Sequence, residues 1–399
     1  MYVPDETILN RYADVLINFA LNSGEGIKPG ETVYLQVPEN AKPLLIALRK
    51  AVWKSKGHMI VDYLPDNVAR DFYEVADDSQ LDFFPGKYLK GIVDEMDHAV
   101  MIIADTDKKE LEGIKPERIM RKSKAFKPYK DWRRDKENRG EFTWTLALYG
   151  TEASAKEAGL SLEEYWNEII KACFLDEDDP VGKWKSVYDE VERIRHALTN
   201  LAIEKLKVRG QGIDLIVGLG ENRCWLGGSG RNIPSFEVFI SPDARITEGK
   251  VRFNQPLYRY GNIVKGIRLE FKDGKVVKAE ADSGLEVLEE MIKVEGANKI
   301  GEFSLTDARL SRITKFMAET LFDENIGGEF GNMHIALGEA YKDSYPGDAS
   351  KVSKEQWNEM GYNESVVHTD MVSTEDKEVI AVLKDGSEKV IYKSGKFLI

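Results

Sequence analysis

The sequence predicts an α/β N-terminal domain with a mainly parallel, layered sheet, followed by an α+β, β-rich C-terminal domain. Three observations support this prediction. The chain has 399 residues, which is more than one hydrophobic core usually organises. Its first half alternates helix-like with strand-like segments, whereas alternating strands and hairpin turns dominate from residue 214 onward. We therefore expect two domains, 1–190 and 191–399, joined within a helical connection.

The first domain begins with a predicted helix. Asp5 can cap this helix, and Ile8, Tyr12, Val15 and Phe19 recur at the spacing of one helical face. After a Pro-Gly turn, the expected elements are a strand over 32–37, a helix near 42–56, a strand over 58–63 and a strand over 99–104. Strands that alternate with helices of this length are expected to pair in parallel.

The later segments change in character along the chain. Residues 152–206 are predicted to be mostly helical, with a capping box that joins Ser161 to Glu164. Beyond them, Asp-Gly hairpin turns are expected at 272–275 and 384–387, together with a helix near 307–322. The second domain is therefore expected to consist mainly of strands joined by hairpins.

The composition of the chain narrows the functional classes. With 56 basic and 69 acidic residues the net charge is −13, which argues against a general nucleic-acid or anionic-membrane surface. The basic run 121–124 is interpreted as a solvated face. Cys173 and Cys224 fit neither a zinc-ligand spacing nor a disulfide framework. Neither a signal peptide nor an apolar run of about 20 residues is evident, so a cytoplasmic protein is expected.

The most informative segment is the apolar run 366–372, which contains His368 and Asp370. Successive side chains of a strand point to opposite faces, so these two groups should project from the same side. An imidazole and a carboxylate are costly to bury unless they are paired or bound, and a metal ion is the natural partner. His334 lies in a similar apolar setting and is one of only 5 histidines in the chain.

Further carboxylates lie in apolar or glycine-bounded segments of the second domain. They are Glu237, Glu302, Asp323, Glu324 and Glu329. Each of them alone would be interpreted as a strand, turn or helix-end residue. Together with the two histidines they form the ligand inventory of a two-metal hydrolase. Mixed oxygen and nitrogen donors suit zinc, cobalt or manganese better than calcium or copper.

Two rival interpretations are weaker. The glycine-rich segment 227–232 is followed by Pro234 and a strand pattern, so a phosphate-binding loop is not favoured. The segment is interpreted instead as shaping the approach to Glu237. Gly228-Ser229-Gly230 superficially resembles a nucleophile elbow, but no full Gly-x-Ser-x-Gly motif supports a Ser-His-Asp triad.

Several blocks of the chain match, in order, the blocks of one known family. They begin in the opening helix and its Pro-Gly turn and continue at Asp179-Pro180-Val181. The most specific blocks are 232–242, Gly301-Glu302, 320–325, 334–341 and 368–370. By these blocks the chain resembles the metallo-aminopeptidases that include aminopeptidase T and aminopeptidase S. This resemblance implies a homodimeric exopeptidase with two divalent metal ions in an internal cavity.

The resemblance also implies roles for individual residues. The metal ligands that it implies are Glu237, Glu302, His334, His368 and Asp370, with Tyr341 as the group that stabilises the oxyanion. The family has a further ligand glutamate five residues before its first histidine. Here Glu324 in the matching block lies ten residues before His334, whereas Glu329 restores the spacing of five. Glu329 is favoured because spacing to a histidine on a strand is a geometric constraint, and Glu324 stays the alternative.

The sequence therefore predicts a metal-dependent aminopeptidase that acts on peptides. Glu302 would help to deprotonate the attacking water, and Tyr341 would donate to the oxyanion. Two alternatives remain open. One is a dinuclear amidohydrolase or dipeptidase acting on other small amides, and the other is a non-catalytic binding protein stabilised by its metal ions. No nucleic-acid or membrane partner is expected.

Overall fold

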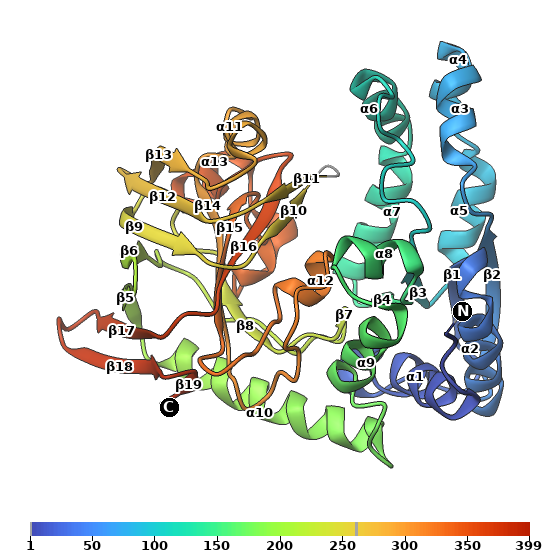
Figure 1. Ribbon diagram of the computed structural model, residues 1–399, viewed down its shortest axis with the longest axis horizontal. Coiled ribbons are helices and arrows are strands. Elements are labelled where there is room, and N and C mark those ends of the chain that lie inside the picture. Colours follow the sequence, from blue (N-terminus) through green and yellow to red (C-terminus); the bar gives the residue numbers. More distant parts are fainter. Residues whose placement is uncertain (1, 260–261) are drawn as a thin grey trace. The chain divides into compact units, whose positions relative to one another are not determined.

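The computed structural model describes residues 2–259 and 262–399 (Figure 1). The chain divides into two compact units: unit 1 is Met1–Lys185 with Ser229–Ile233, and unit 2 is Ser186–Gly228 with Pro234–Ile399. The first division falls inside helix α10 (Pro180–Asn200). The segment after Gly228 returns to unit 1 because it contains β7, which pairs with β4. The sequence patterns gave no sign of this return.

Unit 1 contains a parallel sheet in the strand order β2-β1-β3-β4-β7. The strands are β1 (Thr32–Pro38), β2 (His58–Leu64), β3 (His98–Ile103), β4 (Thr143–Leu148) and β7 (Asn232–Ile233). Every neighbouring pair in this sheet runs in parallel. The predicted α/β domain with a parallel sheet is therefore confirmed.

The helices of unit 1 begin largely where local signals predict them. The Asp5 carboxylate accepts a hydrogen bond of 2.9 Å from the backbone N–H of Ile8, and Ser161 and Glu164 form the predicted capping box. No helix in the described part of the chain is long and apolar enough to cross a membrane. The helices of unit 1 are α1 (Glu6–Asn18), α2 (Lys42–Lys54), α3 (Ala69–Val75), α4 (Asp78–Asp82), α5 (Gly86–Glu95), α6 (Pro116–Ala125), α7 (Lys127–Asn138), α8 (Glu152–Glu157) and α9 (Leu162–Ala172).

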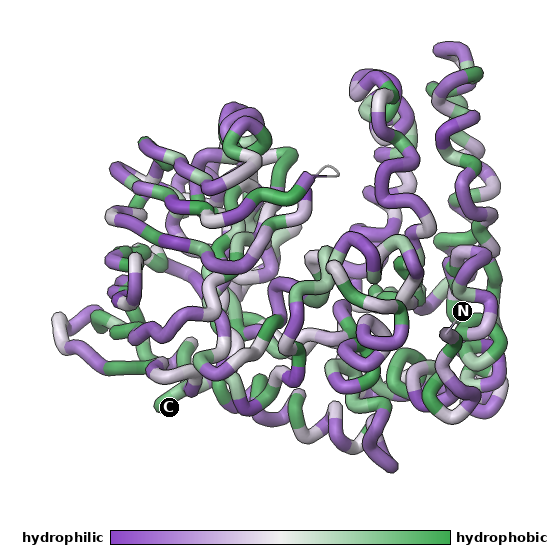
Figure 2. Tube along the Cα trace, viewed as in Figure 1, coloured by the Kyte–Doolittle hydropathy of each residue, from purple (hydrophilic) through white to green (hydrophobic). Residues whose placement is uncertain are grey.

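Basic side chains of α6 and α7 bind the ends of other helices in unit 1. Figure 2 shows both helices as predominantly hydrophilic. Arg118 donates to the carbonyl oxygens of Tyr73 and Ala76 at the end of α3. Lys136 donates to the carbonyl oxygen of Met96, just beyond α5, at 2.7 Å. The last carbonyl groups of a helix have no partner within it, so part of the basic character of this region has a structural role.

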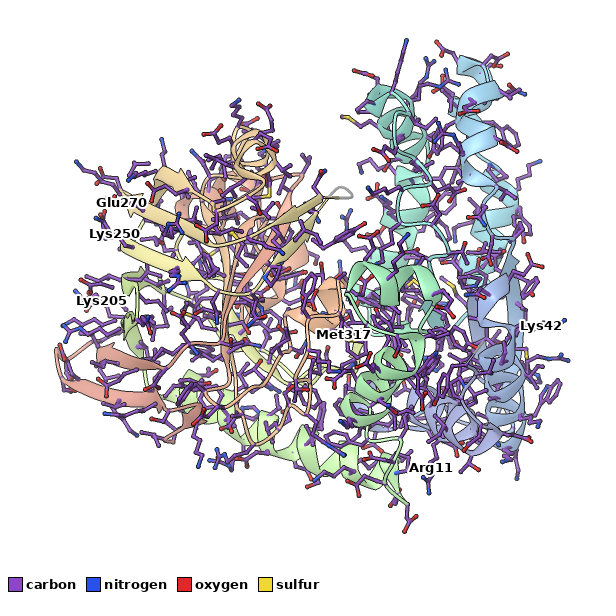
Figure 3. All side chains as sticks on the ribbon, in the orientation of Figure 1. Arg11, Lys42, Lys205, Lys250, Glu270 and Met317 are labelled. Carbon is purple, nitrogen blue, oxygen red and sulfur yellow. The ribbon has the colours of Figure 1, made fainter. Side chains whose placement is uncertain are left out.

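Unit 2 is built mainly from antiparallel strands, as the hairpin signals predict. A large sheet has the order β13-β12-β9-β6-β5-β17-β18-β19, and a smaller one has the order β16-β15-β14-β8. Lys250 of β9 lies opposite Glu270 of β12 in the large sheet, with Nζ and Oε2 3.6 Å apart (Figure 3). The strands of the large sheet are β5 (Ile203–Gly210), β6 (Ile213–Gly218), β9 (Thr247–Phe253), β12 (Ile267–Lys272), β13 (Lys275–Glu280), β17 (Lys377–Leu383), β18 (Glu388–Lys393) and β19 (Lys396–Phe397).

The remaining elements of unit 2 include the smaller sheet, which carries the predicted ligands. Its strands are β8 (Glu237–Ile240), β14 (Ile300–Thr306), β15 (Asn332–Gly338) and β16 (His368–Ser373). Every residue of β14 and β15 is buried, so both strands lie in the core of unit 2. A separate hairpin pairs β10 (Leu257–Arg259) with β11 (Asn262–Val264), and the helices besides α10 are α11 (Leu285–Ile292), α12 (Thr320–Asp323) and α13 (Lys354–Glu359).

The predicted helix near 307–322 is wrong, because only Thr320–Asp323 is helical there. The carboxylate of Asp323 accepts hydrogen bonds from the backbone N–H groups of Met317, at 2.6 Å, and Glu319, at 3.0 Å. Ala318 between them has a φ of 50°. A side chain has therefore taken backbone donors that a longer helix would have bound itself, and the chain enters α12 through a turn.

Candidate metal centre

Three strands of the smaller sheet place predicted ligands on a common face. Ala336 of β15 lies between Glu302 of β14 and Asp370 of β16 in the strand register. His334 precedes Ala336 by two residues, and His368 precedes Asp370 by two. Because side chains alternate along a strand, all of them project from the same face as Ala336. The small side chain of Ala336 leaves space between the polar groups.

The edge strand β8 adds a third carboxylate to this face. Glu237 pairs with Thr306, which lies four residues after Glu302 on β14 and so faces the same way. Asn325 holds the start of β8 in place, because its Oδ1 accepts the backbone N–H of Phe236 at 2.7 Å. The asparagine belongs to the 320–325 block, but its bond to β8 had no signal in the sequence.

Glu302 lies between the two histidines. Its Oε1 is 3.0 Å from Nε2 of His334, and its Oε2 is 3.8 Å from Nε2 of His368. Oε2 of Glu237 lies 3.3 Å from the same nitrogen of His334. One atom from each of Glu237, Glu302 and His334 can be chosen so that all lie within 4.8 Å of one another. On the other side, Oδ1 of Asp370 is 3.5 Å from Nε2 of His368.

Both imidazole rings are oriented by backbone carbonyl groups. Nδ1 of His334 lies 3.1 Å from the carbonyl oxygen of Glu324, and Nδ1 of His368 lies 2.9 Å from that of Glu339. A carbonyl oxygen can only accept, so each Nδ1 carries the proton and donates it. Each Nε2 is therefore directed at the carboxylates, which is the orientation of metal-binding histidines in proteins. Sequence reasoning could not find these backbone partners.

At several groups of the centre, burial and the neighbouring charges shift the pKa in opposite directions. Burial raises the pKa of the Glu302 carboxyl, and its hydrogen bond with His334 opposes that rise. Burial would lower the pKa of His368, but Asp370 and Glu302 raise it to about 9. Burial would raise the pKa of Asp370, but His368 holds it at about 2. The cluster therefore favours positive charge at its imidazole nitrogens.

The residues present fit a divalent metal ion. Burial and the neighbouring Glu237 raise the pKa of Glu324 well above its usual value. Burial would lower the pKa of His334, but hydrogen bonds to Glu237 and Glu302 raise it well above its usual value. Several buried carboxylates in one place are costly unless a cation balances them. Oxygen and imidazole donors of this kind suit zinc, cobalt or manganese.

The structure places Glu324, and not Glu329, beside this cluster. Glu324 is buried next to α12, and Nδ2 of Asn332 binds its carbonyl oxygen at 2.8 Å. Glu329 is exposed in a loop with positive φ at Gly328 and Gly331. The burial of Glu324 therefore favours the alternative over Glu329 as the further ligand. The expectation that favoured Glu329 counted residues back from His334 as if they continued a strand, whereas the chain leaves the sheet at this point.

Tyr341 lies at the edge of the cluster. Its ring centroid is 4.8 Å from that of His368 and 5.8 Å from that of Phe239. The backbone N–H of Tyr341 donates to Oγ of Ser241 at 2.8 Å, which holds Tyr341 beside the end of β8. Tyr341 as a whole is 45% exposed, but desolvation by its surroundings and the negative charges of Glu302 and Asp370 raise the pKa of its phenol. The hydroxyl therefore stays protonated and can donate a hydrogen bond.

The whole chain resembles proteins of one family. The model of the family described as thermophilic metalloprotease (M29) matches residues 5–397. Aminopeptidase T of Thermus aquaticus is 30% identical over 423 residues, covering 98% of each chain. Aminopeptidase PepS of Streptococcus thermophilus is 30% identical over 421 residues, again covering 98% of each. The solved structure of wild-type AmpT from Thermus thermophilus matches with a TM-score of 0.84 and 26% identity, over 98% of this chain and 99% of the other.

Proposed function

Because this chain belongs to the family of thermophilic metalloproteases (M29), we propose that it is a dinuclear aminopeptidase that removes N-terminal residues from peptides. The position of Glu302 carries the proposal. Its two oxygens face different imidazoles, as a carboxylate between two metal ions would require. The similarity to aminopeptidases T and PepS along nearly the whole chain supports the choice of substrate. Unit 2 is then the catalytic domain.

The proposed ligands all come from unit 2. They are Glu237, Glu302, Glu324, His334, His368 and Asp370. His334 and Glu237 would help to hold one ion and His368 and Asp370 the other, with Glu302 close to both sets of ligands. When bound, the two ions supply the Lewis acidity that activates water and polarises a peptide carbonyl.

Glu302 and Tyr341 would perform the proton and charge chemistry. Glu302 takes a proton from the attacking water as its oxygen bonds to the carbonyl carbon. Glu302 then returns that proton to the amide nitrogen as the carbon–nitrogen bond breaks, which releases a free amino acid and a shortened peptide. The protonated phenol of Tyr341 donates to the carbonyl oxygen while it carries negative charge. The free amine of the substrate would be held by a metal ion or a carboxylate of the centre, which would restrict cleavage to the first residue.

Metal removal combined with two kinds of substrate tests the proposal. Purified protein should contain close to two divalent ions per chain, lose activity on chelation, and regain it with zinc, cobalt or manganese. It should cleave peptides with a free amine and leave matched N-acetylated peptides intact. Equal cleavage of both substrates would favour a general amidohydrolase. One ion per chain with no activity toward either substrate would favour a metal-stabilised binding protein and overturn the proposal.

We also propose a homodimer, on the family resemblance. Light scattering on the purified protein tests this point. A mass near twice 45.2 kDa is expected, and a mass near 45.2 kDa across the working concentrations would contradict it.

A further inference from the structure

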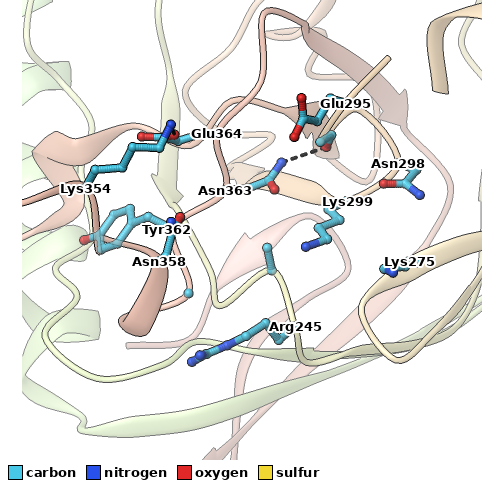
Figure 4. Close-up of a pocket in the computed structure, with 13 residues that line it drawn as sticks. Arg245, Lys275, Glu295, Asn298, Lys299, Lys354, Asn358, Tyr362, Asn363 and Glu364 are labelled. Carbon is cyan, nitrogen blue, oxygen red and sulfur yellow. Dashed lines mark hydrogen bonds and ion pairs between the residues drawn. The ribbon is translucent and has the colours of Figure 1, made fainter. Parts of the chain in front are cut away.

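Unit 2 contains a polar pocket of 480 Å³ that shares no lining residue with the candidate metal centre (Figure 4). Its wall is formed by the turn before β14, the start of β13, the segment after β8 and the segment around α13. The volume lies in the range of small-molecule sites in proteins. The proposed aminopeptidase reaction has no use for this pocket.

The charge of the pocket is opposite to that of the chain. Four basic residues and two acidic residues line it, a net charge of +2 in a protein with a net charge of −13. The basic residues are Arg245, Lys275, Lys299 and Lys354, and the acidic residues are Glu295 and Glu364. A concave surface with this charge attracts anions, because its walls concentrate the field inside it.

Two of the four cations already have a carboxylate partner. Nη2 of Arg245 lies 2.6 Å from Oδ2 of Asp243, and Nζ of Lys354 lies 2.8 Å from Oε2 of Glu364. Lys275 and Lys299 form no ion pair with any residue in the described ranges 2–259 and 262–399. Their ammonium groups are therefore available to a ligand. In Figure 4 both side chains lie on the side of the pocket opposite Lys354.

The backbone holds these two lysines next to each other. The N–H of Val276, the residue after Lys275, donates to the carbonyl oxygen of Asn298 at 2.8 Å. Asn298 directly precedes Lys299, and its amide side chain also lines the pocket. The carbonyl oxygen of Lys299 accepts the N–H of Gly338 at 2.9 Å, which ties this turn to β15. The arrangement is thus fixed by the fold and does not depend on flexible side chains alone.

The facing wall is also fixed. Nδ2 of Asn363 donates to the carbonyl oxygens of Gly296, at 2.7 Å, and Gly338, at 2.6 Å. Tyr362 packs edge-on against Trp357 with a centroid separation of 4.7 Å. A pocket with two prepared walls loses little conformational entropy when a ligand binds.

We propose that this pocket is a second binding site, for a small organic dianion that carries carboxylate or phosphate groups. The two free ammonium groups of Lys275 and Lys299 bind one anionic group, and the amide of Asn298 donates a hydrogen bond to it. The two negative charges of the ligand match the two lysine ammonium groups that have no carboxylate partner. The site belongs to unit 2 and is independent of the reaction proposed for the metal centre.

Calorimetric titration of the metal-loaded protein with inorganic phosphate and with succinate tests the site. We expect saturable binding of at least one probe, weakened about tenfold in Lys275→Met and in Lys299→Met, because each variant removes one charged hydrogen-bond donor. Lys299→Arg should retain binding, which separates loss of charge from loss of fold. Lys272→Met is the matched control, because Lys272 is exposed at the end of β12 in the same hairpin and does not line the pocket.

A second arm distinguishes the pocket from the metal centre, which can also bind anions. His368→Ala should leave the binding of the probe intact. Stronger binding of phosphate would indicate a phosphate ester as the ligand, and stronger binding of succinate a dicarboxylate. The proposal is overturned if neither probe binds. It is equally overturned if binding persists in both Lys→Met variants, or disappears in His368→Ala alone.

Discussion

Nδ1 of His368 donates a hydrogen bond of 2.9 Å to the backbone carbonyl oxygen of Glu339. Glu339 directly follows Gly338, which lies opposite His368 in the register of β15 and β16. The ring is therefore held by the sheet itself, with Nε2 directed at Glu302 and Asp370. An imidazole that is held in this way would lose little conformational entropy on binding a metal ion.

Removal of this imidazole should separate metal binding from folding. His368→Ala is expected to lose at least one metal ion per chain and to lower kcat/KM by about 100-fold or more. The side chain is partly exposed, so the thermal unfolding transition of the metal-free protein should stay cooperative. Metal analysis, peptide hydrolysis and calorimetry measure the three quantities. His196→Ala, at an exposed position of α10, is the control. Full metal content and activity in His368→Ala would contradict the assignment.

Glu324 and Glu329 form a matched pair for the remaining ligand. Glu324→Gln should weaken metal binding by about tenfold or more and lower kcat, because it replaces a buried carboxylate at the cluster. Glu329→Gln should leave both quantities within about twofold of the unmodified protein, since Glu329 is exposed. Titration of the metal-free protein with zinc gives the affinities. The reverse order of effects would show that the spacing of five residues, and not the buried position, identifies the ligand.

The phenol hydroxyl of Tyr341 should affect kcat strongly and KM only slightly. Tyr341→Phe keeps the ring that packs against His368 and Phe239 but removes the donor. We expect kcat to fall by about 100-fold with KM and metal content nearly unchanged, because a donor to the oxyanion acts mainly in the transition state. Tyr345→Phe removes a hydroxyl from a ring packed on Trp357 and serves as the control. A change in KM alone would assign Tyr341 to substrate binding.

Local patterns predicted the parts of the fold that depend on neighbours in sequence. The Asp5 cap and the Ser161 capping box need only three or four residues, and both form. The common face of His368 and Asp370 follows from strand alternation, and the two side chains indeed approach each other. These features are determined within a single element, so the sequence contains the information directly.

Features that depend on strand order could not be predicted from local sequence patterns. Nothing in the sequence states that β14 lies between β15 and β8, which is what brings Glu302 beside His334. The exposed position of Glu329 had no signal in the sequence for the same reason, because residue spacing says nothing about where a loop leaves the sheet. Likewise, the pairing of β7 with β4 joins residues that are far apart in the chain. Tertiary pairing decides these positions, and local propensity does not.

The buried Lys377 should make the stability of the protein depend on pH in the alkaline range. Its side chain is 2% exposed, and burial lowers its pKa from 10.5 to about 8 although Asp376 and Glu375 oppose the shift. The penalty for burying the charge is fully present below pH 8. Between pH 8 and 10.5 the unfolded chain binds more protons at this residue than the folded chain, so the free energy of unfolding rises with pH.

Lys377→Met removes this dependence and so measures it. From pH 7 to pH 10.5, the unfolding free energy of the unmodified protein should rise by about 3 kcal/mol relative to that of the variant. All other groups that titrate in this pH range are the same in both proteins, so their contributions cancel in the difference. The variant also lacks the 3.3 Å hydrogen bond from Lys377 to the carbonyl oxygen of Phe330. Urea unfolding at several pH values gives the difference, and the exposed Lys389→Met is the control. A difference that stays constant across this range would show that the ammonium group of Lys377 keeps its ordinary pKa in the folded protein.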